Sequence, residues 1–326
     1  MDQIDQIAGQ IEHITTPITN KIRFIEYFNG KAALMTHCRE IIRILTEAIG
    51  ERTLEKHDNL EKSRKFIFEY FHRCGTTPVE QAYSVNGMET ANIIAEIRGT
   101  KLPDEVIIIG AHYDTVSDTV GANDNASGIA ALLELHRLLK KHKHKRTIRF
   151  AAFTLEEPPY FETENMGSFI YARKCSKQND NIKLMICLDM LAYGGSFVKQ
   201  QIPLTSMLGK YPAKGNYLVA ASLPPYRNFT YMLKNIYNES ARVPIYDAIA
   251  PASLKGINNS DHASFHKFGI PNLMITDTGF YRSNFYHTEK DTIDSLNFRF
   301  LMNNIVNLYK TIREILNIKN FPEKEN

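Results

Sequence analysis

The sequence contains no tryptophan, no long apolar run and only four cysteines, none of them in a C-x-x-C pair: Cys38, Cys74, Cys175 and Cys187. Cysteines this few and this widely spaced argue against a disulfide scaffold and against a thiolate metal site, so we expect reduced thiols. A membrane-spanning helix needs about 18 or more apolar residues. Because the sequence has no such stretch, we predict no membrane partner.

The sequence also lacks an excess of charge of either sign. Lys and Arg together number 39 and Asp and Glu 36, which leaves a net charge of +3. So small an excess does not favour neutralisation of phosphates, and we predict no nucleic-acid partner. The N-terminus lacks the basic start and apolar run of a secretory signal, and we therefore expect a cytoplasmic location.

The length of 326 residues would suit roughly two domains of about 150 residues, although α/β folds often run that long as one domain. Isoleucines recur at helical spacing near the N-terminus, and Pro17 interrupts the pattern. No linker marks a second domain. We therefore predict a peripheral N-terminal extension over residues 1–30 and one folded domain over residues 31–326.

Two predicted helices come first, and a long alternation of strands and helices follows. The helices cover residues 32–49 and 60–73, and each ends at or just before a glycine that suits a C-terminal cap. The later strands are predicted at 92–97, 106–111, 147–155, 182–188, 217–221 and 272–276, and the later helices at 126–141, 167–174, 228–239 and 298–316. This alternation predicts a single three-layer αβα domain, an α/β fold whose mostly parallel mixed sheet is covered by helices on both faces.

Side chains that bind metals follow three successive predicted strands at the point where each strand ends. They are His112 and Asp114, then Glu156 and Glu157, then Asp189. Two more lie in loops, Asp124 before helix 126–141 and His287 after the last strand. Because ligands of open α/β sheets bind outside the carboxyl ends of the strands, we expect these side chains to converge there.

The charges of these side chains suit a pair of metal ions. Three carboxylates, from Asp124, Glu157 and Asp189, together with one bridging hydroxide make four negative charges, which two divalent cations balance. His112 and His287 add neutral nitrogen donors. Imidazole and carboxylate ligands favour Zn²⁺, with Co²⁺ or Mn²⁺ as alternatives. One carboxylate shared by two ions is typical of a two-metal hydrolytic centre.

The adjacent glutamates predict two different roles. Neighbouring residues that leave a strand point in opposite directions, so Glu157 can bind a metal while Glu156 acts as general base. Asp114, two residues beyond His112, lies on the same side of an extended chain and can accept the free imidazole N–H. Taken singly, Asp124 would be a helix cap and the glutamates solvated surface, but capping and solvation do not explain their shared position at strand ends.

Six segments, in this order, carry a resemblance to a known family. They are GAHYDT at 110–115, GANDNASGIAALLEL at 121–135, FTLEE at 153–157, CLDM at 187–190, SDHASFHKFGIP at 260–271 and YHTEKDT at 286–292. The chain resembles the co-catalytic zinc aminopeptidases of metallopeptidase family 28, typified by bacterial leucyl aminopeptidase, over roughly residues 32–316. Residues 31–326 would then form a zinc-dependent peptidase domain. Six ordered segments are far more specific than one short motif.

The resemblance implies a ligand set and a mechanism. His112 and Asp189 would bind one metal, Glu157 and His287 the other, and Asp124 both, with Glu156 as the base. The family often has a cis peptide after the bridging aspartate, here Asp124-Asn125. Asn125 departs from the pattern, because many relatives have a second acid there; this removes no ligand.

Further residues have two interpretations each. Tyr286 resembles a tyrosine that donates a hydrogen bond to the oxyanion in some relatives, but it also suits an aromatic core. Asp261 and His262 occupy a family position near the site, which predicts a role in substrate binding, and Asp261 equally suits a helix cap. The segment FYRSNFY at 280–286 would either line the pocket for the substrate side chain or cover the core.

The leading hypothesis is a two-zinc aminopeptidase that hydrolyses peptides with a free N-terminus through a metal-bridging hydroxide and a glutamate base. One rival is a glutaminyl-cyclase-like acyltransferase with one zinc, and another is a carboxypeptidase of the same family. A non-catalytic binding module is the third, since folds of this kind also serve binding functions. Metal stoichiometry and the substrate's free amine distinguish them, and the oligomeric state stays open.

Overall fold

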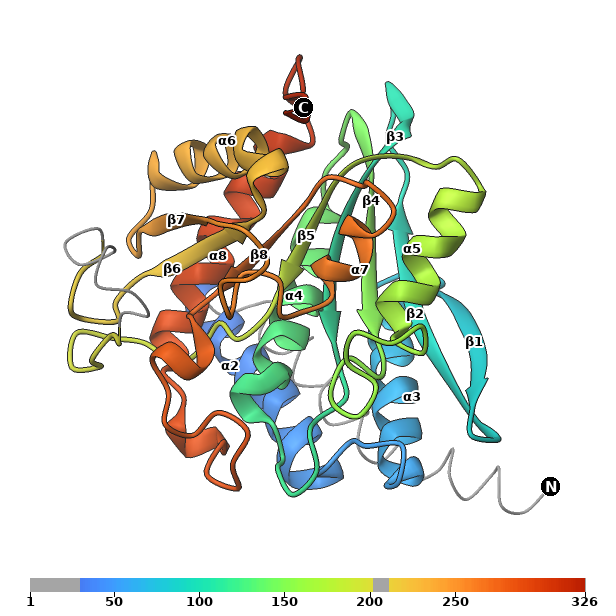
Figure 1. The fold of residues 1–326 in the computed structure, drawn as a ribbon, viewed down its shortest axis with the longest axis vertical. Coiled ribbons are helices and arrows are strands. Elements are labelled where there is room, and N and C mark those ends of the chain that lie inside the picture. The colour runs from blue at the N-terminus through green and yellow to red at the C-terminus, as the bar shows by residue number, and fades with distance from the viewer. Residues whose placement is uncertain (1–29, 202–210, 326) are drawn as a thin grey trace.

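The computed structural model describes residues 30–201 and 211–325 (Figure 1). The predicted N-terminal helix and nearly all of the predicted extension over residues 1–30 lie outside the described part. Within it, no helix has the length and apolar character needed to cross a bilayer.

The described chain alternates strands and helices as the sequence predicts. The helices are α2 (Gly30–Arg43), α3 (His57–Arg73), α4 (Gly128–Leu139), α5 (Gly167–Lys177), α6 (Arg227–Asn238), α7 (His262–His266) and α8 (Phe298–Ile315). The strands are β1 (Val79–Val85), β2 (Met88–Ile97), β3 (Leu102–His112), β4 (Arg146–Phe153), β5 (Asn181–Leu188), β6 (Leu218–Ser222), β7 (Ile245–Ile249) and β8 (Asn272–Thr276). Two wide helical turns, η1 (Ile44–Ile49) and η2 (Ala122–Ser127), directly follow α2 and precede α4.

The eight strands form one mixed sheet in the order β1-β2-β4-β3-β5-β8-β6-β7. Its centre, β4-β3-β5-β8, is parallel throughout. Antiparallel pairs join β1 to β2, β2 to β4, and β6 to β8. The second half of β3 is buried along its whole length, because a central parallel strand has a covered surface on both sides.

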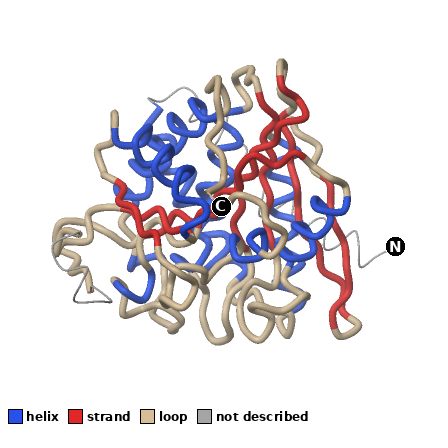
Figure 2. The backbone as a smooth tube through the Cα atoms, turned by 45° about the horizontal axis from the view of Figure 1, so that its top comes forward, coloured by secondary structure: helices blue, strands red, loops and turns tan. Residues whose placement is uncertain are grey.

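Helices cover both faces of this sheet (Figure 1). On one face α5 packs against α7, with α5 on β2 and α7 on β5 and β8. On the other face α2, α3, α4 and α8 pack against one another, and α6 packs on β6, β7 and α8. The predicted three-layer α/β fold is thereby confirmed. Figure 2 shows the loops gathered along one edge of the molecule, the edge at which the parallel strands end.

Most predicted elements are present with boundaries shifted by a few residues, and three elements were missed. These are β1, whose side chains are mostly exposed at the sheet edge, the edge strand β7, and the five-residue helix α7. The helix predicted at 126–141 is wrong at its start, because η2 occupies residues 122–127. The predicted glycine caps are confirmed: Gly50 and Gly75 have φ of 93° and 81°, a region that favours glycine.

Arg52 is fully buried and joins the chain before α3 to the loop after β3. Its guanidinium donates hydrogen bonds of 2.7 to 3.2 Å to five backbone carbonyls, those of Leu45, Gly50, Tyr113, Val120 and Gly121. Its backbone N–H also donates to the Thr115 hydroxyl. Because that loop lies between His112 and Asp124, Arg52 holds the segment that joins two predicted metal ligands.

We expect the substitution Arg52→Met to lower the free energy of unfolding by about 3 kcal/mol or more, because buried carbonyls that lose their donors each cost about 1 to 3 kcal/mol. Urea denaturation measures the change. The matched control is Arg98→Met at an exposed site, which should change the free energy by less than about 0.5 kcal/mol. An Arg52→Met protein as stable as the control would contradict this role.

Candidate metal centre

The sheet brings together the side chains that follow its central strands. His112 is the last residue of β3 and pairs in register with Phe153, the last residue of β4. Glu156 and Glu157 follow β4, and Asp189 follows β5. Each of these four side chains is about 95% or more buried. Neighbouring parallel strands therefore end side by side and direct their next residues into one buried space, as the sequence predicts.

Asp124 reaches this space from η2. The turn begins at Gly121, whose φ is 53° and where a Cβ atom would lie 2.1 Å from the Asp124 carbonyl oxygen. Only glycine fits such a close approach. The Asp124–Asn125 peptide bond is cis, as the resemblance implied.

Asn125 ties η2 to the end of β5. Its amide nitrogen donates to the Leu188 carbonyl at 2.9 Å, and its amide oxygen accepts from the backbone N–H groups of Gly128 and Met190. A carboxylate could accept from those N–H groups but could not donate to Leu188. The asparagine therefore connects backbone segments and removes no donor from the cluster.

The two carboxylate oxygens of Asp124 face two different histidines. Oδ1 lies 3.3 Å from Nε2 of His112, and Oδ2 lies 3.2 Å from Nε2 of His287. His112 Nε2 is also 3.8 Å from Asp189 Oδ1, and His287 Nε2 is 3.2 Å from Glu157 Oε2. The predicted ligands thus form two groups of three that share Asp124. His287 comes from the loop after β8 and is the most exposed, at 27%.

These groups have the spacing and the chemistry of zinc ligands. Around an ion with bonds of about 2.1 Å, tetrahedral ligands lie roughly 3.4 Å apart. Glu157 Oε1 and Asp189 Oδ1 are buried and have no hydrogen-bond partner among the described residues. Buried polar atoms normally have a partner, so these two oxygens point to one that the protein itself does not provide. The donors are nitrogen and carboxylate oxygen, a set that suits Zn²⁺.

Three further aspartates, Asp114, Asp277 and Asp291, support the residues of this centre through hydrogen bonds. Asp114 accepts the Glu157 N–H at 3.0 Å, and its other oxygen lies 3.6 Å from His112 Nδ1, so it holds one predicted ligand and lies beside another. Asp291 accepts the N–H groups of Asn123 and Asp124. Asp277 accepts from the Asn123 amide and the Tyr193 N–H. Sequence reasoning identified Asp114 but missed Asp277 and Asp291, although Asp291 lies within the segment YHTEKDT.

Without cations the cluster must hold protons. Burial raises the pKa of Glu157 to about 7, and repulsion from Asp124 adds to that effect. Burial lowers the pKa of His287, but its contacts with Asp124 and Glu157 outweigh this and raise the pKa to about 10. Burial also raises the pKa of Glu156 well above its ordinary value. Metal binding would therefore replace protons in this cluster.

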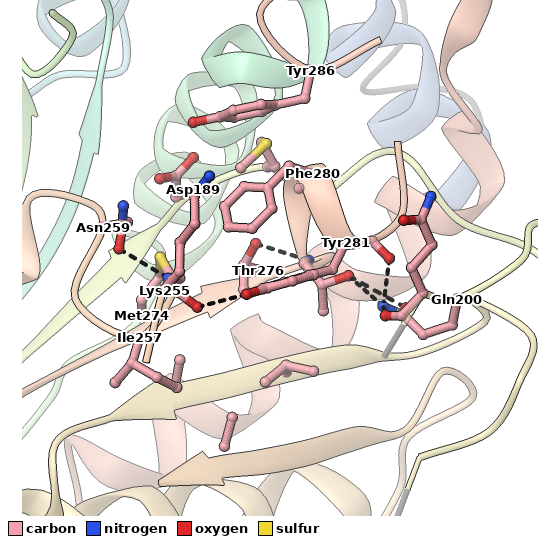
Figure 3. Close-up of a pocket in the computed structure, with 18 of the residues that line it drawn as sticks. Asp189, Gln200, Lys255, Ile257, Asn259, Met274, Thr276, Phe280, Tyr281 and Tyr286 are labelled. Atoms are coloured by element: carbon pink, nitrogen blue, oxygen red, sulfur yellow. Dashed lines mark hydrogen bonds between the residues drawn. The ribbon is translucent and has the colours of Figure 1, made fainter. Parts of the chain in front are cut away.

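An apolar cavity opens beside Asp189 (Figure 3). Phe280, Tyr281 and Tyr286 line it, so the segment FYRSNFY contributes to a pocket wall. The Tyr286 ring stacks on His287 with centroids 3.7 Å apart. Arg282 of the same segment is buried and donates to the Tyr217 carbonyl instead. The tyrosine thus lies where the cavity meets the cluster.

Asp261 and His262, at the start of α7, are fully buried, and neither is among the described residues that line the cavity. His262 Nε2 lies 2.8 Å from the Ile257 carbonyl oxygen, and burial lowers its pKa to about 4, which leaves the imidazole neutral. Asp261 makes no side-chain cap, and burial raises its pKa to about 7. The contact of Asp261 and His262 with substrate stays a prediction. Their position suits support of the cavity wall at Ile257.

A three-layer α/β fold with a buried histidine–carboxylate cluster at the carboxyl ends of its parallel strands is typical of metal-dependent hydrolases. Comparison with known proteins identifies the family. Residues 92–311 match peptidase family M28, and the chain belongs to that family. The family is one of peptidases, and leucine aminopeptidases are among the named relatives.

Individual relatives vary in how much of their length this chain covers. It is 36% identical to the uncharacterized protein YfbL of Escherichia coli over 79% of this chain and 81% of YfbL. It is 28% identical to a probable leucine aminopeptidase of Arthroderma otae over 67% of this chain but only 55% of that protein. The chain therefore spans about half the length of the fungal relative.

Solved structures share the fold at low identity. The zinc aminopeptidase BSAP of Bacillus subtilis superimposes with a TM-score of 0.56 at 24% identity, over 72% of this chain and 52% of BSAP. A glutaminyl cyclase of Fimbriiglobus ruber superimposes with a TM-score of 0.61 at 17% identity, over 86% of this chain and 94% of the cyclase. The fold alone therefore does not separate peptidase from cyclase.

We expect zinc binding to release protons and to weaken as the pH falls. His287, with a metal-free pKa of about 10, is protonated at pH 7 and must lose its proton to bind a metal. Below pH 10 the apparent affinity should drop about tenfold per pH unit for each proton displaced. Calorimetric titration in buffers of different ionisation enthalpy counts the protons.

The variant His287→Gln should release fewer protons and bind less zinc. The exposed His72→Gln is the matched control and should titrate like the unsubstituted protein. A pH-independent affinity without proton release would contradict this account of the cluster.

Proposed function

We propose that this chain is an aminopeptidase with two divalent metals, zinc in both positions, that removes N-terminal residues from peptides. The observation that carries the proposal is the position of Asp124, whose two oxygens face His112 and His287 at 3.3 and 3.2 Å. A carboxylate placed in this way suits an ion on each side. His112 and Asp189 would complete one metal site, and Glu157 and His287 the other.

Bound metals would supply Lewis acidity toward the scissile carbonyl and lower the pKa of a water molecule. The protein's own residues would do the remainder of the work. Glu156 is buried at the cluster, with Oε2 3.8 Å from His112 Nε2. In the proposed reaction its carboxylate takes a proton from the attacking water and passes it to the departing amine. Burial raises the pKa of Glu156 in the metal-free cluster, and bound cations would lower it again toward the range that suits a general base.

Two features support recognition of the N-terminal residue. The cluster is rich in buried carboxylates, which attract the positively charged α-amine of a peptide. The apolar cavity beside Asp189 offers a place for the first side chain. Tyr286 lies between these two features and could donate its hydroxyl proton in a hydrogen bond to the carbonyl oxygen as charge develops there. The aminopeptidase name of the fungal relative also favours this reaction.

We expect Glu156→Gln to lower kcat by about 10² to 10⁴, because the amide cannot accept the proton. The variant should still bind two equivalents of zinc, measured by metal analysis of the purified protein. Glu164→Gln, at a side chain that is 77% exposed, is the matched control and should retain full activity. A Glu156→Gln enzyme of ordinary activity would remove Glu156 from the mechanism.

One alternative function is an acyltransferase with one zinc, because a glutaminyl cyclase has a similar fold. The presence of both three-residue groups favours two metals over one. We therefore expect zinc content near two equivalents, hydrolysis of aminoacyl anilides, and no cyclisation of a peptide that begins with glutamine. N-acetylation of a peptide substrate should abolish turnover; an acetylated peptide that is still cleaved from its other end would identify a carboxypeptidase.

A further inference from the structure

One positively charged residue, Lys255, lines the apolar cavity, and its side chain is exposed to solvent. Its described lining is mostly aliphatic and aromatic, with Ile257, Met274 and Phe280 among the contributors. Only two described lining residues are ionisable at neutral pH, Asp189, which belongs to the metal centre, and Lys255. Because it is the one positive charge among the described residues that line this mostly apolar cavity, the lysine distinguishes the pocket chemically.

The backbone around Lys255 is held in place. Its carbonyl oxygen accepts a hydrogen bond from the Tyr281 hydroxyl at 3.0 Å. The next residue, Gly256, donates its N–H to the Asn259 side chain at 2.9 Å. The lysine side chain extends past the Phe280 ring toward the end of the cavity where Asp189 lies (Figure 3). Its position relative to the pocket is therefore set by the fold.

The Lys255 ammonium has only a weak partner within the described chain. It lies 4.7 Å from the centre of the Phe280 ring, a cation–π contact. Several described arginines and Lys234 form ion pairs, but no described carboxylate lies within 4.0 Å of the Lys255 ammonium. A cation–π contact at an exposed site is weak, so the ammonium can turn toward a better partner.

The side-chain amide of Gln200, which also lines the cavity, already has hydrogen-bond partners. Gln200 accepts from Arg282 Nε at 2.8 Å, and its amide nitrogen donates to Thr278 and to the Tyr281 carbonyl. It has little capacity left for a substrate. Lys255, the one described lining residue with a positive charge, is the group most able to respond to the charge of a side chain that enters the cavity.

We infer that Lys255 determines specificity by selecting the charge of the substrate's N-terminal side chain. An aliphatic side chain would pack on the apolar wall, and an acidic one would also pair with the ammonium. The side chains of lysine and arginine would be rejected, because they would bring a second cation beside Lys255 in a partly desolvated space. This inference rests on the proposed aminopeptidase activity.

The experiment compares kcat/KM for leucyl, glutamyl and lysyl anilides in the zinc-loaded enzyme and its variants. We expect Lys255→Glu to lower the glutamyl-to-leucyl ratio about fivefold and to raise the lysyl-to-leucyl ratio about fivefold, mainly through KM. Lys255→Met, which keeps the length of the side chain without its charge, should give intermediate ratios. The changes in both kcat/KM ratios should become smaller at high salt, because the side chain of residue 255 is near solvent.

The matched control is Lys319→Glu, which makes the same charge change at an exposed residue that is not among the described residues lining the cavity. It should leave all three ratios unchanged. An unsubstituted enzyme that hydrolyses none of the anilides would overturn the proposed function. An enzyme that hydrolyses leucyl anilide, but whose ratios stay within twofold in Lys255→Glu, would overturn only the inference about Lys255.

Discussion

The dominant constraint on this structure is a concentration of buried negative charge at the carboxyl edge of the sheet. Asp114, Asp124, Glu156, Glu157 and Asp189 are all about 95% or more buried around two histidines. Uncompensated carboxylates in such a place are costly, and they must bind protons or cations. The nearby cation Arg52 is fully engaged with backbone carbonyls and forms no ion pair among the described residues. Divalent metal ions would compensate the negative charge of these carboxylates with the fewest added groups.

The fold makes this concentration of charge possible because several separate elements supply and fix the acids. Parallel strands supply the residues at their ends, η2 inserts Asp124, and the loop after β8 adds His287. Leu155, Met190 and His287 have positive φ although none is a glycine. Such backbone is unfavourable and persists only where its surroundings enforce it. Here the three lie at or beside predicted ligands, which indicates that the surrounding packing holds them in place.

The central sheet and the residues brought together at its edge could be predicted from sequence, because buried strands and the acids that follow them are local signals. The strand at 272–276 is confirmed at both ends. Elements β1 and β7 escaped prediction because edge strands lack a continuous apolar run, and α7 because five residues show no helical period. The roles of Arg52, Asp277 and Lys255 depend on contacts between segments far apart in the chain, and no spacing within the sequence reveals such contacts.

The chemistry and the selectivity of the proposed site come from different parts of the fold. The metal cluster is built mainly at the ends of the parallel strands β3, β4 and β5, and the shared fold of an aminopeptidase and a glutaminyl cyclase shows that this scaffold is compatible with more than one reaction. The cavity shares Asp189 with the cluster, but the rest of its described lining comes mainly from β6, β7, β8, the loop that carries Lys255, and the segment at 280–286. Loops tolerate substitution better than a packed sheet does. A change of substrate side chain therefore requires no change in the cluster, and a lysine in the cavity wall can alter which peptides are bound while the proposed proton transfer by Glu156 stays the same.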